Sequence, residues 1–289
     1  RQIAQELECN FNASGETVIH SEDLEKLVFG IKEPMYRTGF DRNLWLWEQY
    51  SPEATYMMTA DVARGDGADF SVFHIVKLET MEIIGEYRGK PNLEEFASIL
   101  DSTGREFGNC LLVVENNSLG ISILEKLQDR SYPNLYYSIK GTHEYIDQLR
   151  AESISNSVPG FTTSSKTRPL IVAKMEEFIR NKLITIYSSR IVDEFKTFIW
   201  NNNKAEAMRS YHDDLVMALA IACWVRDTAL TINKKDLEYK RAMLDAMRLN
   251  SRKMQTTIPG MQGHKQGVWS DNAKKEMQQQ KDFIWLIKG

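Results

Sequence analysis

The sequence predicts an α/β fold built on a mixed five-stranded sheet, in which an antiparallel meander is followed by a βαβ unit and helices flank the sheet. Three apolar, strand-like runs between 56 and 88 are separated by connections too short to contain a crossover helix. A helical pattern then precedes a wholly apolar run at 110–114. With 289 residues, one globular domain plus extensions is the expected organisation.

The three strands of the meander are expected at Tyr56–Ala60, Ser71–Leu78 and Met81–Arg88. The segment Arg64–Asp69 between the first two is rich in Gly and Asp, which are typical of turns. Only Glu79–Thr80 separates the second strand from the third. Neighbouring strands joined by such short turns run antiparallel.

The second half of the sheet alternates helix and strand. Leu93–Phe107 carries apolar residues at helical spacing and precedes a buried strand at Cys110–Glu115. A helix at Ile121–Leu127 and a final strand at Asn134–Ser138 complete the pattern. A mixed five-stranded sheet in this order is the plan of ribonuclease-H-like proteins.

The remainder of the chain divides into a polar segment and further helices. Gly141–Lys166 is mostly polar and is expected to be a mobile loop. Helical periodicity returns at 170–179 and at 191–200. A last helix, starting near Asp213 and ending near Trp224, is almost entirely apolar and is expected to be buried.

Three parts of the chain follow from this pattern: a connecting arm at 1–54, a ribonuclease-H-like domain at 55–232, and a basic C-terminal tail at 233–289. The tail carries 12 Lys and Arg against 6 Asp and Glu, although the whole chain has a net charge of −4. An acidic body is unfavourable for nucleic acid unless cations neutralise its carboxylates. The chain does not begin with Met and is expected to be a fragment or processed product.

The composition argues against several other classes of protein. Cys9, Cys110 and Cys223 are far apart and form no CxxC pair, which disfavours a zinc site or a disulfide framework. No apolar run is long enough to span a bilayer, and the first residues do not resemble a signal peptide. A reducing, cytoplasmic setting fits these features.

Carboxylates stand at three points where the predicted elements converge. Asp61 follows the first strand, Glu115 ends the fourth, and the pair Asp213 and Asp214 opens the apolar helix. Mg²⁺ and Mn²⁺ take carboxylate oxygens as ligands. Two such ions about 4 Å apart can activate water and stabilise the leaving oxygen in phosphodiester hydrolysis. These residues therefore predict a two-metal site.

Each carboxylate also has a structural explanation. Asp61 can serve as a turn residue, and Asp213 can cap its helix. Glu115 is harder to explain in this way, because it follows a buried run. Asp214 lies on the same side of its helix as apolar residues, which directs it towards the interior. His212 is a possible ligand or hydrogen-bond donor, but caps and surface positions are more usual for a lone histidine.

The sequence resembles the nuclease domain of the large terminase subunit of tailed, T4-like bacteriophages. The resemblance spans roughly residues 56–224, and the motif around Asp213 is its most specific part. The matching segments are Thr59–Gly65 with Asp69–Ser71, Val113–Asn117 with Gly120, Thr167–Pro169, and Tyr211–Ala220.

The resemblance implies a ribonuclease-H-like fold and cleavage of concatemeric viral DNA during genome packaging, with two Mg²⁺ or Mn²⁺ ions. It implies that Asp61, Glu115 and one member of the aspartate pair bind metal. We favour Asp214 as the primary ligand and Asp213 as an accessory ligand. Positive charge and loop position favour three residues as phosphate contacts. These are Arg64, Lys166 and Arg168.

The implied partners are double-stranded DNA, the portal or procapsid, and the small terminase subunit, in the host cell cytoplasm. Full-length members of the family also carry an N-terminal packaging ATPase. No GxxxxGK[ST] loop occurs in this chain, so ATP-driven translocation is not assigned to it.

Three alternatives remain open from the sequence. A junction resolvase or transposase of the same fold would use the same carboxylates. An actin-like nucleotide-binding module also begins its sheet with an Asp and a Gly-containing turn, but leaves Glu115 and the aspartate pair unexplained. A catalytically idle assembly module is the third alternative.

Overall fold

The computed structural model describes residues 17–63, 67, 69–117, 119–140, 145–146, 148–151, 154–202, 204–227 and 229. The chain divides into two units, residues 1–235 and 236–289. The predicted basic tail at 233–289 lies outside the described residues. All elements named below belong to the first unit.

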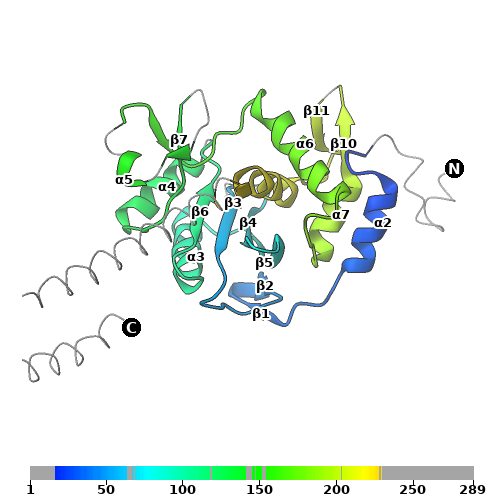
Figure 1. Ribbon diagram of the computed structural model, residues 1–289, viewed down its shortest axis with the longest axis horizontal. Coiled ribbons are helices and arrows are strands. Elements are labelled where there is room, and N and C mark those ends of the chain that lie inside the picture. The colour runs from blue at the N-terminus through cyan, green and yellow to red at the C-terminus, as the bar shows by residue number, and fades with distance from the viewer. Residues whose placement is uncertain are drawn as a thin grey trace, which may run out of the picture. The chain divides into compact units, whose positions relative to one another are not determined.

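A six-stranded mixed sheet forms the centre of this unit, with its strands in the order β1-β2-β5-β4-β3-β6 (Figure 1). The predicted meander is present as β3 (Tyr56–Asp61), β4 (Ser71–Lys77) and β5 (Glu82–Gly89), each antiparallel to the next. After helix α3 (Leu93–Glu106), β6 (Leu111–Val114) runs parallel to β3. The predicted α/β class, with a meander followed by a crossover, is confirmed.

The predicted number of five strands is wrong: two strands from the predicted connecting arm join the sheet, and the predicted last strand is not one of the six. They are β1 (Tyr36–Thr38) and β2 (Leu44–Leu46), and β2 pairs antiparallel with β5. Without them β5 would present a row of unpaired backbone groups at the edge of the sheet. Each strand has only three residues, and all three in β1 are exposed, so neither shows apolar alternation. The role of 1–54 as a link stays a prediction.

Two segments share the outer edge of β6. The predicted last strand contributes only one parallel bridge, between Leu135 and Leu112, before the chain leaves for a separate three-stranded sheet. Phe161 pairs with Glu115 just beyond β6. Regular structure therefore occurs within the segment predicted as a loop. The elements within that segment are β8 (Tyr145–Ile146), α5 (Gln148–Ala151) and β9 (Ser157–Pro159), and β8 and β9 pair with β7 (Tyr137–Ile139), which precedes it.

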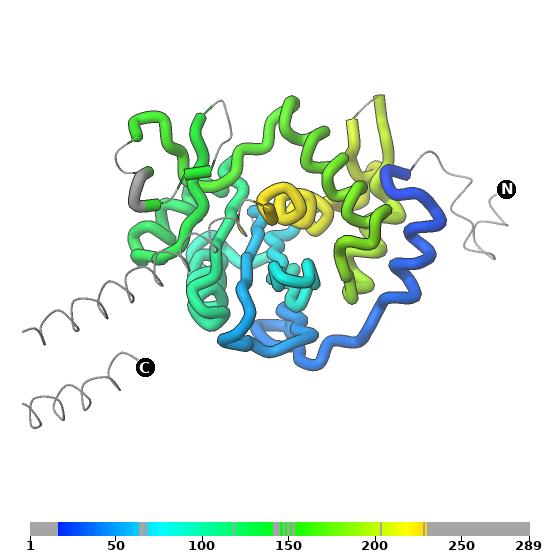
Figure 2. Tube along the Cα trace, viewed as in Figure 1, coloured from blue at the N-terminus to red at the C-terminus, as the bar shows by residue number. Residues whose placement is uncertain are grey.

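Helices cover both faces of the central sheet (Figures 1 and 2). α3 and α4 (Gly120–Asp129) pack on one face. α6 (Thr167–Arg180), α7 (Ser189–Thr197) and the helix at 214–227 pack on the other. The remaining elements are α2 (Ser21–Gly30), the 3-10 helix η2 (Phe40–Arg42), and a hairpin of β10 (Phe198–Asn201) and β11 (Lys204–Ala207).

The helix at 214–227 is anchored deeply, as its apolar sequence predicts. Every residue from Leu215 to Cys223 is buried. Burial of one large apolar side chain contributes about 1.5–3 kcal/mol, so this run holds the helix firmly on the sheet. In the described part of the chain, no helix combines the length and apolar character needed to cross a bilayer. The anchoring matters because Asp214 begins this helix.

Candidate metal centre

The carboxyl ends of β3 and β6 lie side by side. Ala60 pairs with Val114 in parallel register, and the N–H of Glu115 donates to the Ala60 carbonyl at 2.9 Å. Side chains alternate along a strand, so Asp61 and Glu115 point to the same face as Met57, which packs in the core that includes the helix at 214–227. Both carboxylates are half-buried.

The charges of two other carboxylates, Glu115 and Asp214, act on Asp61. Burial raises the pKa of Asp61 well above its ordinary value, and the hydrogen-bonded Glu115 carboxylate and the Asp214 charge add to this effect. Like charges disfavour full ionisation of all members of such a group. The group is therefore suited to take up a proton or a cation.

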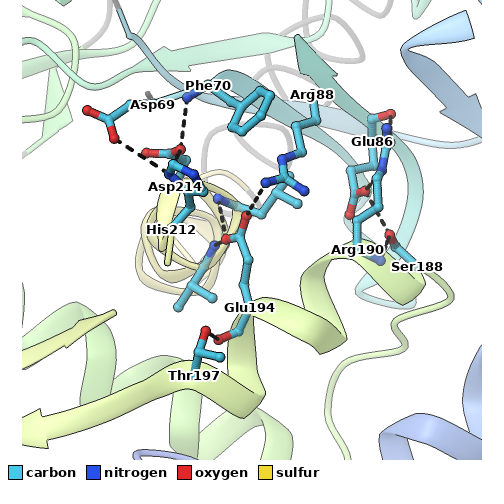
Figure 3. Close-up of polar contacts among 12 residues, drawn as sticks. Asp69, Phe70, Glu86, Arg88, Ser188, Arg190, Glu194, Thr197, His212 and Asp214 are labelled. Atoms are coloured by element: carbon cyan, nitrogen blue, oxygen red, sulfur yellow. Dashed lines mark hydrogen bonds and ion pairs between the residues drawn. The ribbon is translucent and has the colours of Figure 1, made fainter. Parts of the chain in front are cut away.

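Asp214 is held by groups from two parts of the chain (Figure 3). The N–H of Phe70 donates to its Oδ2 at 3.0 Å, and His212 Nδ1 lies 3.9 Å from the same oxygen. His212 Nδ1 is also 3.6 Å from Asp69 Oδ1. Burial raises the pKa of Asp214, although the Phe70 N–H opposes this. Potential ligand atoms of Asp69, His212 and Asp214 all lie within 4.8 Å of one another, which is close enough to hold one metal ion.

Two glycines bring other segments close to the backbone around Glu115. A Cβ on Gly120 would lie 1.7 Å from the Glu115 carbonyl oxygen. A Cβ on Gly160, which has a φ of +79°, would lie 2.5 Å from the Val114 carbonyl oxygen. The side chain of Glu115 accepts a hydrogen bond from Asn117 Nδ2 at 2.8 Å. Close packing and this bond together fix the position of Glu115.

Asp213 has different surroundings from Asp214. Its carboxylate forms an ion pair with Arg168 at the start of α6, and Arg168 Nε also donates to the Ala205 carbonyl at 3.1 Å. The two aspartates are therefore held differently: Asp214 accepts from Phe70 and lies beside Asp69 and His212, whereas Asp213 pairs with Arg168.

The fold was compared with known proteins. No family model matches the sequence. The large terminase nuclease of thermophilic phage G20c with bound magnesium is 20% identical over 72% of this chain and 96% of that chain, with a TM-score of 0.56. The cobalt-bound form of the same nuclease has a TM-score of 0.55 with the same identity and coverage. The large terminase nuclease domain of Thermus phage P74-26 is 21% identical over 69% and 93%, with a TM-score of 0.50.

This chain has the fold of a large terminase nuclease. The ribonuclease-H-like class predicted from the sequence is therefore confirmed. The narrower T4-like grouping, and the roles of individual residues, stay predictions.

The three residues predicted to contact phosphate have different surroundings on this terminase nuclease fold. Lys166 is exposed immediately before α6. Arg168 forms an ion pair with Asp213, and its contact with phosphate stays a prediction. Arg64 lies outside the described residues.

Sequence reasoning missed Asp69 as a site residue and missed a buried polar layer beneath the helix at 214–227. His74 is buried in β4, and its Nε2 lies 2.9 Å from the Leu215 carbonyl oxygen. Glu86 and Glu194 are also buried. One signal was available: Glu194 lies on the apolar side of an amphipathic helix, where an unpaired carboxylate is costly.

Proposed function

We propose that this chain is a metal-dependent DNA endonuclease that cuts concatemeric viral DNA during genome packaging. The adjacency of Asp61 and Glu115 at the ends of β3 and β6, where the charge of Asp214 also raises the pKa of Asp61, carries the proposal. The fold shared with large terminase nucleases supports it. The reaction is hydrolysis of a phosphodiester bond.

The donor set suits hard divalent cations such as Mg²⁺ and Mn²⁺, because it consists mainly of carboxylate oxygens. A cation between Asp61, Glu115 and Asp214 would relieve their mutual repulsion. Asp69 and His212 lie beside Asp214 and offer ligands for a second ion, with Asp214 shared. Two bound ions would supply an activated water and stabilise the leaving oxygen.

The neighbouring charged residues have separate tasks in this proposal. Asp214, rather than Asp213, is the primary ligand from the pair, because Arg168 already neutralises Asp213. Arg168 stays at the rim of the site in this ion pair. Lys166 is exposed and carries the positive charge that a phosphate contact requires.

The substrate class is double-stranded DNA, and the resemblance extends the proposal to partners. These are the portal or procapsid, the small terminase subunit and a separate N-terminal ATPase domain, all in the host cell cytoplasm. The tail at 233–289, with 12 Lys and Arg against 6 Asp and Glu, has the charge to dock on an acidic surface.

Cleavage of supercoiled plasmid in Mn²⁺ or Mg²⁺ tests the proposal. We expect the protein to nick and linearise plasmid with little sequence preference, EDTA to stop the reaction, and Asp61→Ala to reduce it to background. Asp101→Ala is the matched control, because Asp101 is a partly buried aspartate in an ion pair with Arg105 on α3. Undiminished cleavage by the Asp61 variant would overturn the mechanism.

The same preparation distinguishes the alternatives. Strong preference for four-way junctions over linear duplex would indicate a junction resolvase. Thermal stabilisation by adenine nucleotides, without cleavage, would indicate an actin-like module. A protein that is folded but cuts no DNA with any divalent cation would be an assembly module.

A further inference from the structure

Glu194 is a carboxylate in an unusual place. It lies on α7 among the apolar residues Ile191 and Phe195, and only 5% of its surface is exposed. Burial raises the pKa of its carboxyl to about 8, despite the opposing effect of Arg88. A buried carboxyl group is destabilising unless its oxygens are hydrogen-bonded, so its partners indicate its role.

One oxygen of Glu194 binds the start of the helix at 214–227. Its Oε2 accepts from the N–H of Leu215 at 2.9 Å and from the N–H of Val216 at 3.3 Å. The first N–H groups of a helix have no partner within the helix, and the helix dipole favours an acceptor there. The neighbouring Asp213 carboxylate is bound to Arg168 instead. A residue from α7 therefore caps the helix that carries Asp214.

The other oxygen of Glu194 is connected to Asp214 through Arg88 and Phe70 (Figure 3). Its Oε1 faces Arg88 Nη2 at 3.9 Å, and the Arg88 guanidinium lies over the Phe70 ring, 4.1 Å from the ring centre. The N–H of Phe70 donates to Asp214 Oδ2 at 3.0 Å. These contacts form a closed ring, because Asp214 and Leu215 are consecutive residues.

We propose that Glu194 is a positioning residue that fixes the position of Asp214, by capping its helix and by placing Arg88 against Phe70. The inference rests on the proposed function, in which Asp214 binds metal. Glu194 itself touches neither metal nor DNA in this role. Residues that orient metal ligands in this way typically change metal affinity by about 10–100-fold when they are removed.

Mn²⁺ binding, measured by calorimetry without DNA, is the direct test. Glu194→Ala should weaken Mn²⁺ binding about tenfold at a temperature where the variant is folded. Glu194→Gln should bind within about twofold of the unaltered protein, because an amide oxygen still accepts from Leu215 and Val216. A merely structural role would lower the melting temperature without this difference between Ala and Gln.

Glu86 provides the matched control. It is buried on the same face of the sheet, and its Oε1 accepts from Ser188 Oγ and Arg190 Nε, both at 2.7 Å. Glu86→Ala should lower the melting temperature and leave Mn²⁺ affinity unchanged. Equal loss of affinity in both Ala variants, or unchanged affinity in Glu194→Ala, would overturn the positioning role.

Two further variants separate the possible failures. If Glu194→Ala does not fold, Phe70→Leu keeps the N–H that binds Asp214 but removes the ring under Arg88, and should weaken Mn²⁺ binding several-fold. Unchanged Mn²⁺ affinity in Phe70→Leu would then overturn the proposed role of the contacts that connect Glu194 to Asp214. Asp214→Ala tests the proposed function itself: unchanged Mn²⁺ binding there would reject the metal site, whereas lost binding with no effect of Glu194→Ala would reject only the positioning role.

Discussion

The two faces of the central sheet are stabilised in different ways. The face covered by α3 and α4 buries apolar side chains, and the buried residues of these helices include no charged group. The face covered by α7 and the helix at 214–227 buries His74, Glu86 and Glu194, with Arg88 and Arg190 as their partners. Buried ion pairs contribute little net stability.

The two kinds of packing have different structural roles. Apolar packing is tolerant, because residues of similar volume can replace one another at modest cost. Hydrogen bonds and ion pairs are directional, so they define where a helix begins. The face that carries Asp214 thus uses polar contacts that specify position, whereas the opposite face uses contacts that supply stability.

The largest predicted effect is on stability, from the apolar face. Phe96 is fully buried on α3, and Phe96→Ala should lower the free energy of unfolding by about 3–5 kcal/mol. Urea denaturation measures this loss. Cleavage per folded molecule and Mn²⁺ affinity should stay unchanged. A folded Phe96 variant that had lost Mn²⁺ binding would show that the two faces are not separate.

The second largest effect is expected at Gly120, where α4 on the apolar face approaches Glu115. Gly120→Ala would place a Cβ 1.7 Å from the Glu115 carbonyl oxygen, so Glu115 must move. Cleavage should fall on the order of 100-fold, as expected for displacement of a reacting group by about 1 Å. Gly30→Ala is the control, since the atom nearest its Cβ is 3.5 Å away. Equal rates in the two variants would contradict the close approach.

The smallest effect concerns substrate binding rather than either core. Lys166→Glu should weaken binding of double-stranded DNA and reduce the slope of log affinity against log salt by about one, the value for one phosphate contact. Lys182 is exposed beyond the far end of α6, and Lys182→Glu should have smaller effects on both the DNA affinity and the salt slope. A salt slope identical to that of the unaltered protein would exclude Lys166 as a phosphate contact.

The meander, the parallel β6 and the apolar last helix could be predicted because each has a periodicity that backbone geometry imposes. The proximity of Asp61 and Glu115 followed from the same reasoning, since neighbouring parallel strands end at one edge. Strands β1 and β2 could not be predicted. Three residues are too few for a pattern, and their pairing depends on the edge that β5 leaves open.

The remaining site residues depend on contacts between distant segments. Asp69 approaches His212 and Asp214 only through the folding of β4 against the last helix. Glu194 meets Leu215 from another helix. The choice between Asp213 and Asp214 also depended on a distant residue, Arg168. Local sequence indicates which groups are available, but not which of them become neighbours.

The crowding of carboxylates around Asp61 also sets an order of events for the proposed reaction. Without a cation, a proton relieves only part of this crowding, and the remaining negative charge faces a duplex that carries one negative charge per ~1.7 Å of its axis. The site then repels the strand that it would cut. Cation binding must come first, so the supply of free divalent ions decides when the nuclease can accept DNA.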